Sequence, residues 1–190
     1  MSGFSATWLA LRESHDIRAR NADVLAAVTA AYQRHPTIRI ADLACGTGST
    51  MRALSPLLPA RQEWRLVDND IALLSEVDAT KTLDRVVTTA VALDLNRSLD
   101  AALESPIDLV TTSALLDLVS ETWFERLAVT LADRSIPCYA ALSYDGRIDL
   151  TPHDPEDAAI IAAVNAHQRT NKGFGPALGP AAAAFAVTRF

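Results

Sequence analysis

The sequence has 190 residues and is 49% hydrophobic, which allows one substantial buried core but not two independent ones. Its 23 acidic residues outnumber the 17 lysines and arginines, and this balance argues against a broad basic surface for nucleic acid. The two cysteines lack metal-ligand spacing, and no apolar run approaches the roughly 20 residues that span a bilayer. We therefore expect one cytoplasmic domain with no metal, no nucleic-acid partner and no membrane attachment.

Apolar, β-branched segments alternate with amphipathic ones along the chain, a pattern typical of a parallel sheet covered by helices. The N-terminal part is expected to form a short helix around Trp8 and a longer one from Ser14 to Arg34. NKGFGPALGP at 171–180 is predicted to be a loop, and the last ten residues a helix or a frayed tail. Five strands are predicted, at Thr37–Leu43, Glu63–Val67, Arg85–Leu93, Ile107–Thr112 and Pro137–Ser143. The fold class is therefore α/β.

A glycine-rich turn, ADLACGTGSTMRAL at 41–54, joins the first predicted strand to a helix. Glycines at such a turn let the backbone approach a ligand closely. A dinucleotide-binding turn reads GxGxxG, but here Met51 stands where the third glycine is needed. The turn therefore fits another nucleotide-type ligand better, with tight packing of strand on helix as the alternative.

The segment resembles the first motif of class I S-adenosylmethionine-dependent methyltransferases. That motif has an acidic residue at the strand end followed by alternating small residues, here Asp42, Ala44, Gly46 and Gly48. Ala44 departs from the pattern, because a glycine often stands there. The resemblance implies a Rossmann-like, doubly wound, mainly parallel sheet with helices on both faces, and S-adenosylmethionine as cofactor. Its parts would be a helical cover at 1–36, a cofactor-binding core at 37–145 and a helical C-terminal part at 146–190.

Two further strand ends match the family in the correct order. Asp68 ends the second strand, about 20 residues after the glycine turn, where an acidic side chain can accept hydrogen bonds from both ribose hydroxyls. Asp94 and Leu95 follow the third strand and resemble the adenine-binding pair. Each aspartate alone could instead be a turn or capping residue. The full expected cofactor set is Arg12, Asp42, Ala44, Cys45, Gly46, Thr47, Gly48, Asp68, Asn69, Asp94, Leu95 and Ser113.

Arg12 enters this set because an N-terminal helix commonly covers the cofactor in this family, so its guanidinium could meet the cofactor's carboxylate. A surface arginine is the alternative. Asp117, after the fourth strand, could bind a metal or act as a base, but no second ligand stands at suitable spacing, so a helix-surface or capping role is expected.

The methyl acceptor is expected to be a small molecule, and the residues that could bind it lie in the C-terminal part. His167, Arg169 and Lys172 could form a cationic lid for an anion, or could complement the carboxyl end of a helix dipole. The substrate candidates are Tyr144, His153, His167, Arg169 and Lys172. The segment after the fourth strand lacks the Asp/Asn-Pro-Pro-Tyr/Phe sequence of enzymes that methylate nucleic-acid amino groups.

Nothing after Ser143 resembles the two further strands with which the family's sheet usually closes. We expect either that this terminal hairpin is missing or that a second chain completes the sheet, which favours a homo-oligomer. Two other functions stay open: a non-catalytic cofactor-binding or interaction module, and a nicotinamide-dependent oxidoreductase of similar architecture. No residue is assigned as the catalytic base.

Overall fold

The computed structural model describes residues 4–58, 61–77, 85–104 and 106–190. Its contacts divide the chain into two compact units. The first, the sheet unit, comprises the chain up to Ser113 together with Ile136–Leu142. The second, the helical unit, comprises Ala114–Ser135 and Ser143–Phe190.

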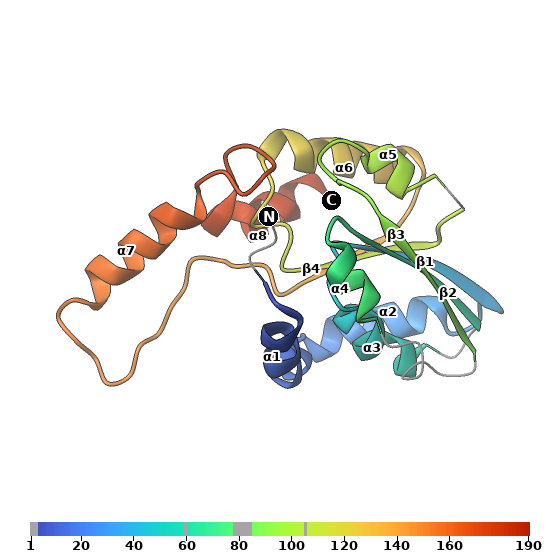
Figure 1. The fold of residues 1–190 in the computed structure, drawn as a ribbon, viewed down its shortest axis with the longest axis horizontal. Helices are drawn as coiled ribbons and strands as arrows, with labels where there is room; N and C mark the ends of the chain where they lie inside the picture. The colour runs from blue at the N-terminus through green and yellow to red at the C-terminus, as the bar shows by residue number, and fades with distance from the viewer. Residues whose placement is uncertain (1–3, 59–60, 78–84, 105) are drawn as a thin grey trace. The chain divides into compact units, whose positions relative to one another are not determined.

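A five-stranded sheet forms the centre of the sheet unit (Figure 1). Its strands run in the order β3-β2-β1-β4-β5, and every neighbouring pair is parallel. This doubly wound order places the carboxyl ends of all strands along one edge. The prediction of an α/β fold with five strands is confirmed. The strands are β1 (Thr37–Leu43), β2 (Arg61–Asp68), β3 (Val86–Ala92), β4 (Leu109–Ser113) and β5 (Cys138–Ala141).

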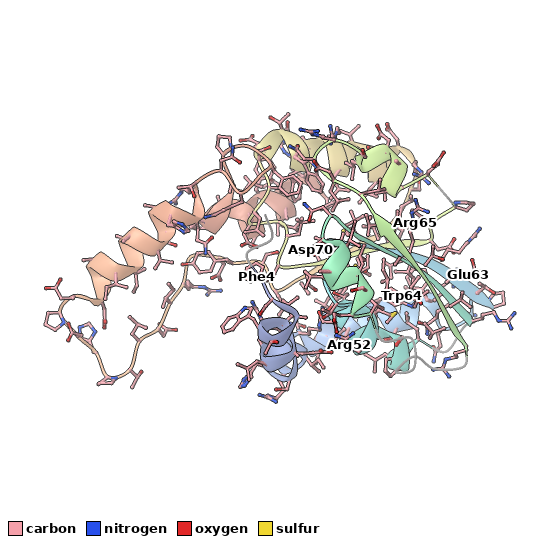
Figure 2. The ribbon with its side chains drawn as sticks, in the orientation of Figure 1. Phe4, Arg52, Glu63, Trp64, Arg65 and Asp70 are labelled. Atoms are coloured by element: carbon pink, nitrogen blue, oxygen red, sulfur yellow. The ribbon has the colours of Figure 1, made fainter. Side chains whose placement is uncertain are left out.

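Successive side chains of β2 point to opposite faces of the sheet (Figure 2). Trp64 is buried among apolar side chains of β1, α2 (Ala22–Tyr32) and α3 (Ser49–Leu54), and its Nε1 donates to Gln62 at 2.9 Å. Arg65 points the other way and donates to the carbonyl of Ala101 in α5 (Leu99–Ala102) at 3.1 Å. Helices of the sheet unit therefore cover both faces.

The N-terminal helices break at a different place from the one predicted. Helix α1 is Ala6–Ala19, and α2 begins at Ala22. Arg20 and Asn21 between them have extended backbone, and the Asn21 side chain accepts hydrogen bonds from the amides of Asp23 and Val24. Asparagine is a strong N-cap, so it starts a new helix inside a stretch whose apolar spacing looks continuous. The prediction of one helix over Ser14–Arg34 was therefore wrong.

Two short elements complete the sheet unit between β1 and β3. They are the 3₁₀ turn η1 (Ser55–Leu57), which follows α3, and helix α4 (Ile71–Ser75), which follows β2. Asp70 caps α4 by accepting from the amides of Ala72 and Leu73. Helix α4 begins just after the carboxyl end of β2, and η1 lies between α3 and the start of β2.

The helical unit contains α6 (Glu121–Asp133), α7 (Asp157–Gln168), a 3₁₀ turn η3 (Gly179–Ala181) and α8 (Ala182–Arg189). The 171–180 loop is hydrogen-bonded within this unit: the amide of Leu178 donates to the Val119 carbonyl at 2.8 Å, and Phe174 lies edge-on to Trp123. This segment is thus a packed part of the unit, and the idea of a freely moving lid is not supported. The last ten residues are mainly helical, so the first of the two predicted alternatives, a helix or a frayed tail, is the one observed.

Candidate functional site

The turn after β1 combines small residues with an unusual backbone. Ala44, Gly46 and Gly48 all have positive φ, at 54°, 54° and 83°. The Cys45 amide donates to the Val67 carbonyl of β2 at 3.0 Å, and the Gly48 amide donates back to the Cys45 carbonyl at 2.8 Å. The alternation of small residues therefore reflects three left-handed positions. Alanine adopts that conformation at a cost of about 1–2 kcal/mol, which explains why Ala44 departs from the pattern without breaking the turn.

Asp68 at the end of β2 reaches across to this turn. Its Oδ2 accepts a hydrogen bond from the Gly46 amide at 2.8 Å, and its Oδ1 accepts from the Asp70 amide at 2.9 Å. Asp68 is buried, although it is the last residue of β2. A carboxylate has about four acceptor sites, so two remain after these contacts. The next residue, Asn69, is exposed.

Asp42, also predicted for the site, is completely buried in β1. Its Oδ1 accepts from the Thr111 hydroxyl of β4 at 2.7 Å, whereas its Oδ2 has no hydrogen-bond partner among the described residues. Burial raises the pKa of Asp42 to about 7; the Thr111 hydrogen bond and the charge of Arg20 act in the opposite direction, and the charge of Asp68 adds to the rise. Asp42 is therefore protonated at a higher pH than a solvent-exposed aspartate.

Arg20 is a buried cation at this site that the sequence analysis did not single out. Its guanidinium donates to the hydroxyls of Ser113 at 3.0 Å, Thr50 at 3.4 Å and Tyr139 at 3.4 Å. The Ser113 and Thr50 hydroxyls are themselves hydrogen-bonded at 2.9 Å. The only signal in the sequence is its place just before the Asn21 helix cap, which cannot be recognised until the helix break is known.

Arg12 lies elsewhere and has a partner of its own. Its Nε is 2.8 Å from Asp16 Oδ2, an ion pair one turn along α1. The structure thus places Arg20, and not Arg12, among the hydroxyls at the strand ends. Helix α1 does lie over the glycine turn, since a Cβ added to Gly46 would come within 3.3 Å of Leu9 Cδ1. The expectation that the N-terminal segment covers the cofactor stays a prediction.

An ion pair joins α1 to the helix after the turn. The Arg52 guanidinium contacts the Glu13 carboxylate, with Nε 2.6 Å from Oε1, and also donates to the Thr47 carbonyl. Helix α1 itself has no buried residue. This pair is therefore a main attachment of α1 to the glycine turn.

A cavity of about 180 Å³ opens beside Arg20. Its walls are residues 19–21 and Val24 at the joint of α1 and α2, and residues 139–142 at the carboxyl end of β5. Small-molecule pockets are usually 300–1,000 Å³. This cavity can hold one end of a ligand but not a whole nucleotide.

Asp94 and Leu95 form a turn after β3. The Asp94 carboxylate accepts from the Asn96 amide at 2.9 Å and lies 3.5 Å from Arg97, while Leu95 is buried. Asp94 is about half exposed, so its side chain is accessible from solvent. The contact of Asp94 with adenine stays a prediction. Its contacts with Asn96 and Arg97 agree with the alternative role of a turn residue.

The predicted acceptor residues do not gather at one point in the helical unit. His153 precedes α7 and is 2.9 Å from Asp157, while His167 ends α7 and lies 3.4 Å from Lys172. His153 contacts Asp157, the first residue of α7, and His167 lies ten residues further along that helix, about 15 Å at a rise of 1.5 Å per residue. One small acceptor cannot contact both.

Two other members of that group also have local partners. Arg169 donates to the Asn165 carbonyl at 3.1 Å, a contact at the carboxyl end of α7 that matches the helix-capping alternative. The Tyr144 hydroxyl donates to Asn165 Oδ1 at 2.8 Å. Asp117 differs from expectation, because it is buried and the Tyr144 amide contacts its carboxylate; burial raises the pKa of Asp117.

The described residues contain no group of three or more His, Cys, Asp and Glu side chains that could hold a metal ion. Burial raises the pKa of the Cys45 thiol, and raises that of Cys138 to about 12, so neither cysteine is an activated nucleophile. In the part of the chain described, none of the helices has the length and apolar character needed to cross a membrane.

Solved structures identify the fold. A cyclopropane-fatty-acyl-phospholipid synthase-like protein from Lactobacillus casei superposes with a TM-score of 0.52, at 13% identity over 94% of this chain and 75% of that chain. A SAM-dependent methyltransferase from Aquifex aeolicus gives 0.51, at 12% identity over 85% and 87%. The chain has the class I methyltransferase fold.

A third structure with the class I methyltransferase fold, the N-terminal domain of EvdMO1 with SAH bound, gives a TM-score of 0.50 at 18% identity, over 87% of this chain and 68% of that chain. No protein-family model and no curated protein matches the sequence. At these identities the likeness concerns the fold, and the chemistry must be argued from the site.

Proposed function

We propose that the chain binds S-adenosylmethionine at the carboxyl ends of β1 to β4 and transfers its methyl group to a small molecule. The single observation that carries this proposal is the buried Asp68 carboxylate, hydrogen-bonded to the amide of Gly46 in a turn with three left-handed residues. This arrangement places the Asp68 carboxylate next to the backbone of the glycine turn. A ribose with two free hydroxyls is the chemical group that both features suit.

The side chains present fit the cofactor by their donors and acceptors. Asp68 retains two acceptor sites, one for each ribose hydroxyl. Gly46 and Gly48 adopt the positive φ values of the turn, and a Cβ at Gly46 would come within 3.3 Å of Leu9 Cδ1, so the glycines allow the backbone and α1 to lie close together. The Asp42 Oδ2 atom has no partner among the described residues, and the hydroxyls of Thr50 and Ser113 lie at the same edge. Polar side chains thus stand at the carboxyl ends of β2, β1 and β4 or just after them, and Asp42 and Thr50 are buried there.

The bound cofactor would supply an activated methyl group on a sulfonium, so the protein's task is positioning. Asp68 would fix the ribose, and the Gly46–Gly48 backbone would define how deeply the ligand enters. Leu9 of α1, which lies against the turn, would exclude water from that side. No general base is assigned, because one is needed only for an acceptor that is protonated when it attacks.

The two other functions make different predictions. A nicotinamide oxidoreductase needs a third small residue for close helix packing, and Met51, completely buried in α3, occupies that position. A non-catalytic module would bind the cofactor without transferring its methyl group. The 23 acidic residues against 17 basic ones, without a basic stretch at the described strand ends, favour a small-molecule acceptor over nucleic acid.

Isothermal titration calorimetry with S-adenosylmethionine, S-adenosylhomocysteine (SAH) and NAD tests the cofactor assignment. We expect the first two to bind and NAD not to bind; binding of NAD alone would favour the oxidoreductase. A metabolite screen with methyl-labelled cofactor then tests transfer. Label in a small molecule supports the enzyme, whereas cofactor binding with no labelled product would support the non-catalytic module.

A further inference from the structure

Arg20 carries a charge, but it has no anionic hydrogen-bond partner among the residues that the structure describes. It is buried, its three side-chain acceptors are neutral hydroxyls, and no carboxylate of the described residues forms an ion pair with it. Its Nε has no partner among those residues. The charge of Arg20 interacts electrostatically with Asp42, without a hydrogen bond between the two side chains. Burying a guanidinium in this way is costly unless an anion joins it.

The cavity next to Arg20 shows where such an anion would enter. Arg20 contributes to its wall, together with Asn21, Val24 and the carboxyl end of β5. Arg20 is the only cationic residue in that wall, and it already interacts with Asp42. One guanidinium suits a singly charged, planar carboxylate, whereas a doubly charged phosphate would need further cations.

The position of the cavity along the sheet separates it from the proposed cofactor. Neighbouring strands are about 4.8 Å apart, and in the order β3-β2-β1-β4-β5 the cavity lies at β5, at the far end from β3. The proposed cofactor site reaches Ser113 at the end of β4, so one strand spacing, about 4.8 Å, lies between it and the cavity at β5. That space is on the side where an acceptor would approach.

We propose that the cavity beside Arg20 binds the carboxylate of the methyl acceptor, so the substrate class is a small carboxylic acid. The identification of this acid as the methyl acceptor rests on the proposed function, whereas the carboxylate site itself does not. Arg20 would bind the carboxylate with donors now given to Ser113 and Tyr139, and the Thr50–Ser113 hydroxyl pair would remain hydrogen-bonded beside it.

Small probes test this site directly. We would measure the melting temperature of the parent protein with acetate and propionate, with their amides acetamide and propionamide, and with inorganic phosphate, each with and without SAH. A ligand that binds the folded state raises the melting temperature by mass action. We expect a rise with the carboxylates and none with the amides or phosphate. Equal responses to acids and amides, or no response to the acids, would overturn the proposal.

Variants assign the response to Arg20. Arg20→Gln removes the charge and should weaken acetate binding by about 10- to 100-fold, as expected for one charge-assisted contact. Arg18→Gln is the matched control, because Arg18 is exposed two positions earlier and should leave the response unchanged. Asn21→Asp keeps a capping oxygen but adds a negative charge to the cavity wall, and should also weaken acetate binding. If urea unfolding shows that Arg20→Gln does not fold, Asn21→Asp alone decides.

The cofactor's own amino-acid end also carries a carboxylate, and a second measurement separates the two. We would titrate parent and Arg20→Gln with SAH and with 5′-methylthioadenosine, which lacks that end. Unchanged SAH affinity supports the acceptor assignment. A loss confined to SAH would show that Arg20 holds the cofactor and would overturn it. Failure of the parent to bind SAH would defeat the proposed function, while the acetate response without SAH would still report on the carboxylate site.

Discussion

Asp68→Asn should damage both the glycine turn and cofactor binding, and the structure separates the two effects. The Asp68 carboxylate accepts from the amides of Gly46 and Asp70, each a charge-assisted hydrogen bond of about 1.5–3 kcal/mol. Asparagine keeps one acceptor oxygen, so one of these bonds is lost and the free energy of unfolding should fall by about 1.5–3 kcal/mol. Alanine would lose both bonds, about 3–6 kcal/mol, which approaches the total stability of many domains.

The same substitution should weaken SAH binding by about 10- to 100-fold, because an amide cannot accept from both ribose hydroxyls with charge assistance. Calorimetry at a temperature well below the melting transition would measure the affinity, and urea unfolding would measure stability. Glu63→Gln is the matched control: it removes a carboxylate from the same strand, but from an exposed position near its amino end (Figure 2). We expect parent-like values for both measurements in that variant.

Two results would refute the reasoning. Parent-like SAH affinity in a folded Asp68→Asn protein would show that the carboxylate does not bind the ribose. Unchanged stability would show that the contacts with the Gly46 and Asp70 amides contribute little in solution. The order of severity, alanine worse than asparagine for stability, follows from the count of lost acceptors and is a separate check.

Three more substitutions test other parts of the site. Gly48 has φ +83°, but an added Cβ would meet only ordinary contacts from 3.5 Å outward. Gly48→Ala should therefore lower the free energy of unfolding by about 1–2 kcal/mol through backbone strain, and Gly48→Val should lower it more. Equal urea midpoints for the parent and these variants would contradict this. Burial raises the pKa of Asp42 from 3.8 to about 7, so its contribution is fully present below about pH 4 and is lost as the pH rises to about 7. This difference of about 3 pH units corresponds to about 4 kcal/mol. Asp42→Asn should flatten that pH dependence in urea unfolding, and an unchanged slope would argue against the buried protonated carboxyl. Glu13→Ala removes the ion pair that ties α1 to Arg52 and should speed both association and release of SAH in stopped-flow measurements, whereas slower release would mean that α1 is not a cover.

Much of the sheet could be read from the sequence, because its signals are local. The apolar β-branched runs of β1 and β4 are buried on both faces of the sheet, and such runs are typical of strands in a parallel sheet. The acidic residues at the strand ends can be located because they stand at the ends of such runs in the sequence. The bounds of β1 agree with the prediction, and those of the other strands shifted by one or two residues: β2 begins at Arg61 and β5 ends at Ala141. The ends of strands depend on hydrogen bonds to neighbours, which the sequence does not contain.

The candidate site was only half predictable for the same reason. Asp68 and the glycine turn are close in the sequence to the strands that hold them, and their place at the carboxyl edge follows from parallel topology. By itself, the sequence determined the fold class, the acidic residues at the ends of successive strands and the small residues of the turn. Only the tertiary structure decided that Arg20 and not Arg12 meets the hydroxyls of Ser113 and Tyr139, since those partners are 93 and 119 residues away. A charged side chain such as Arg20 can be assigned to a site only when the residues that contact it from distant parts of the sequence are known.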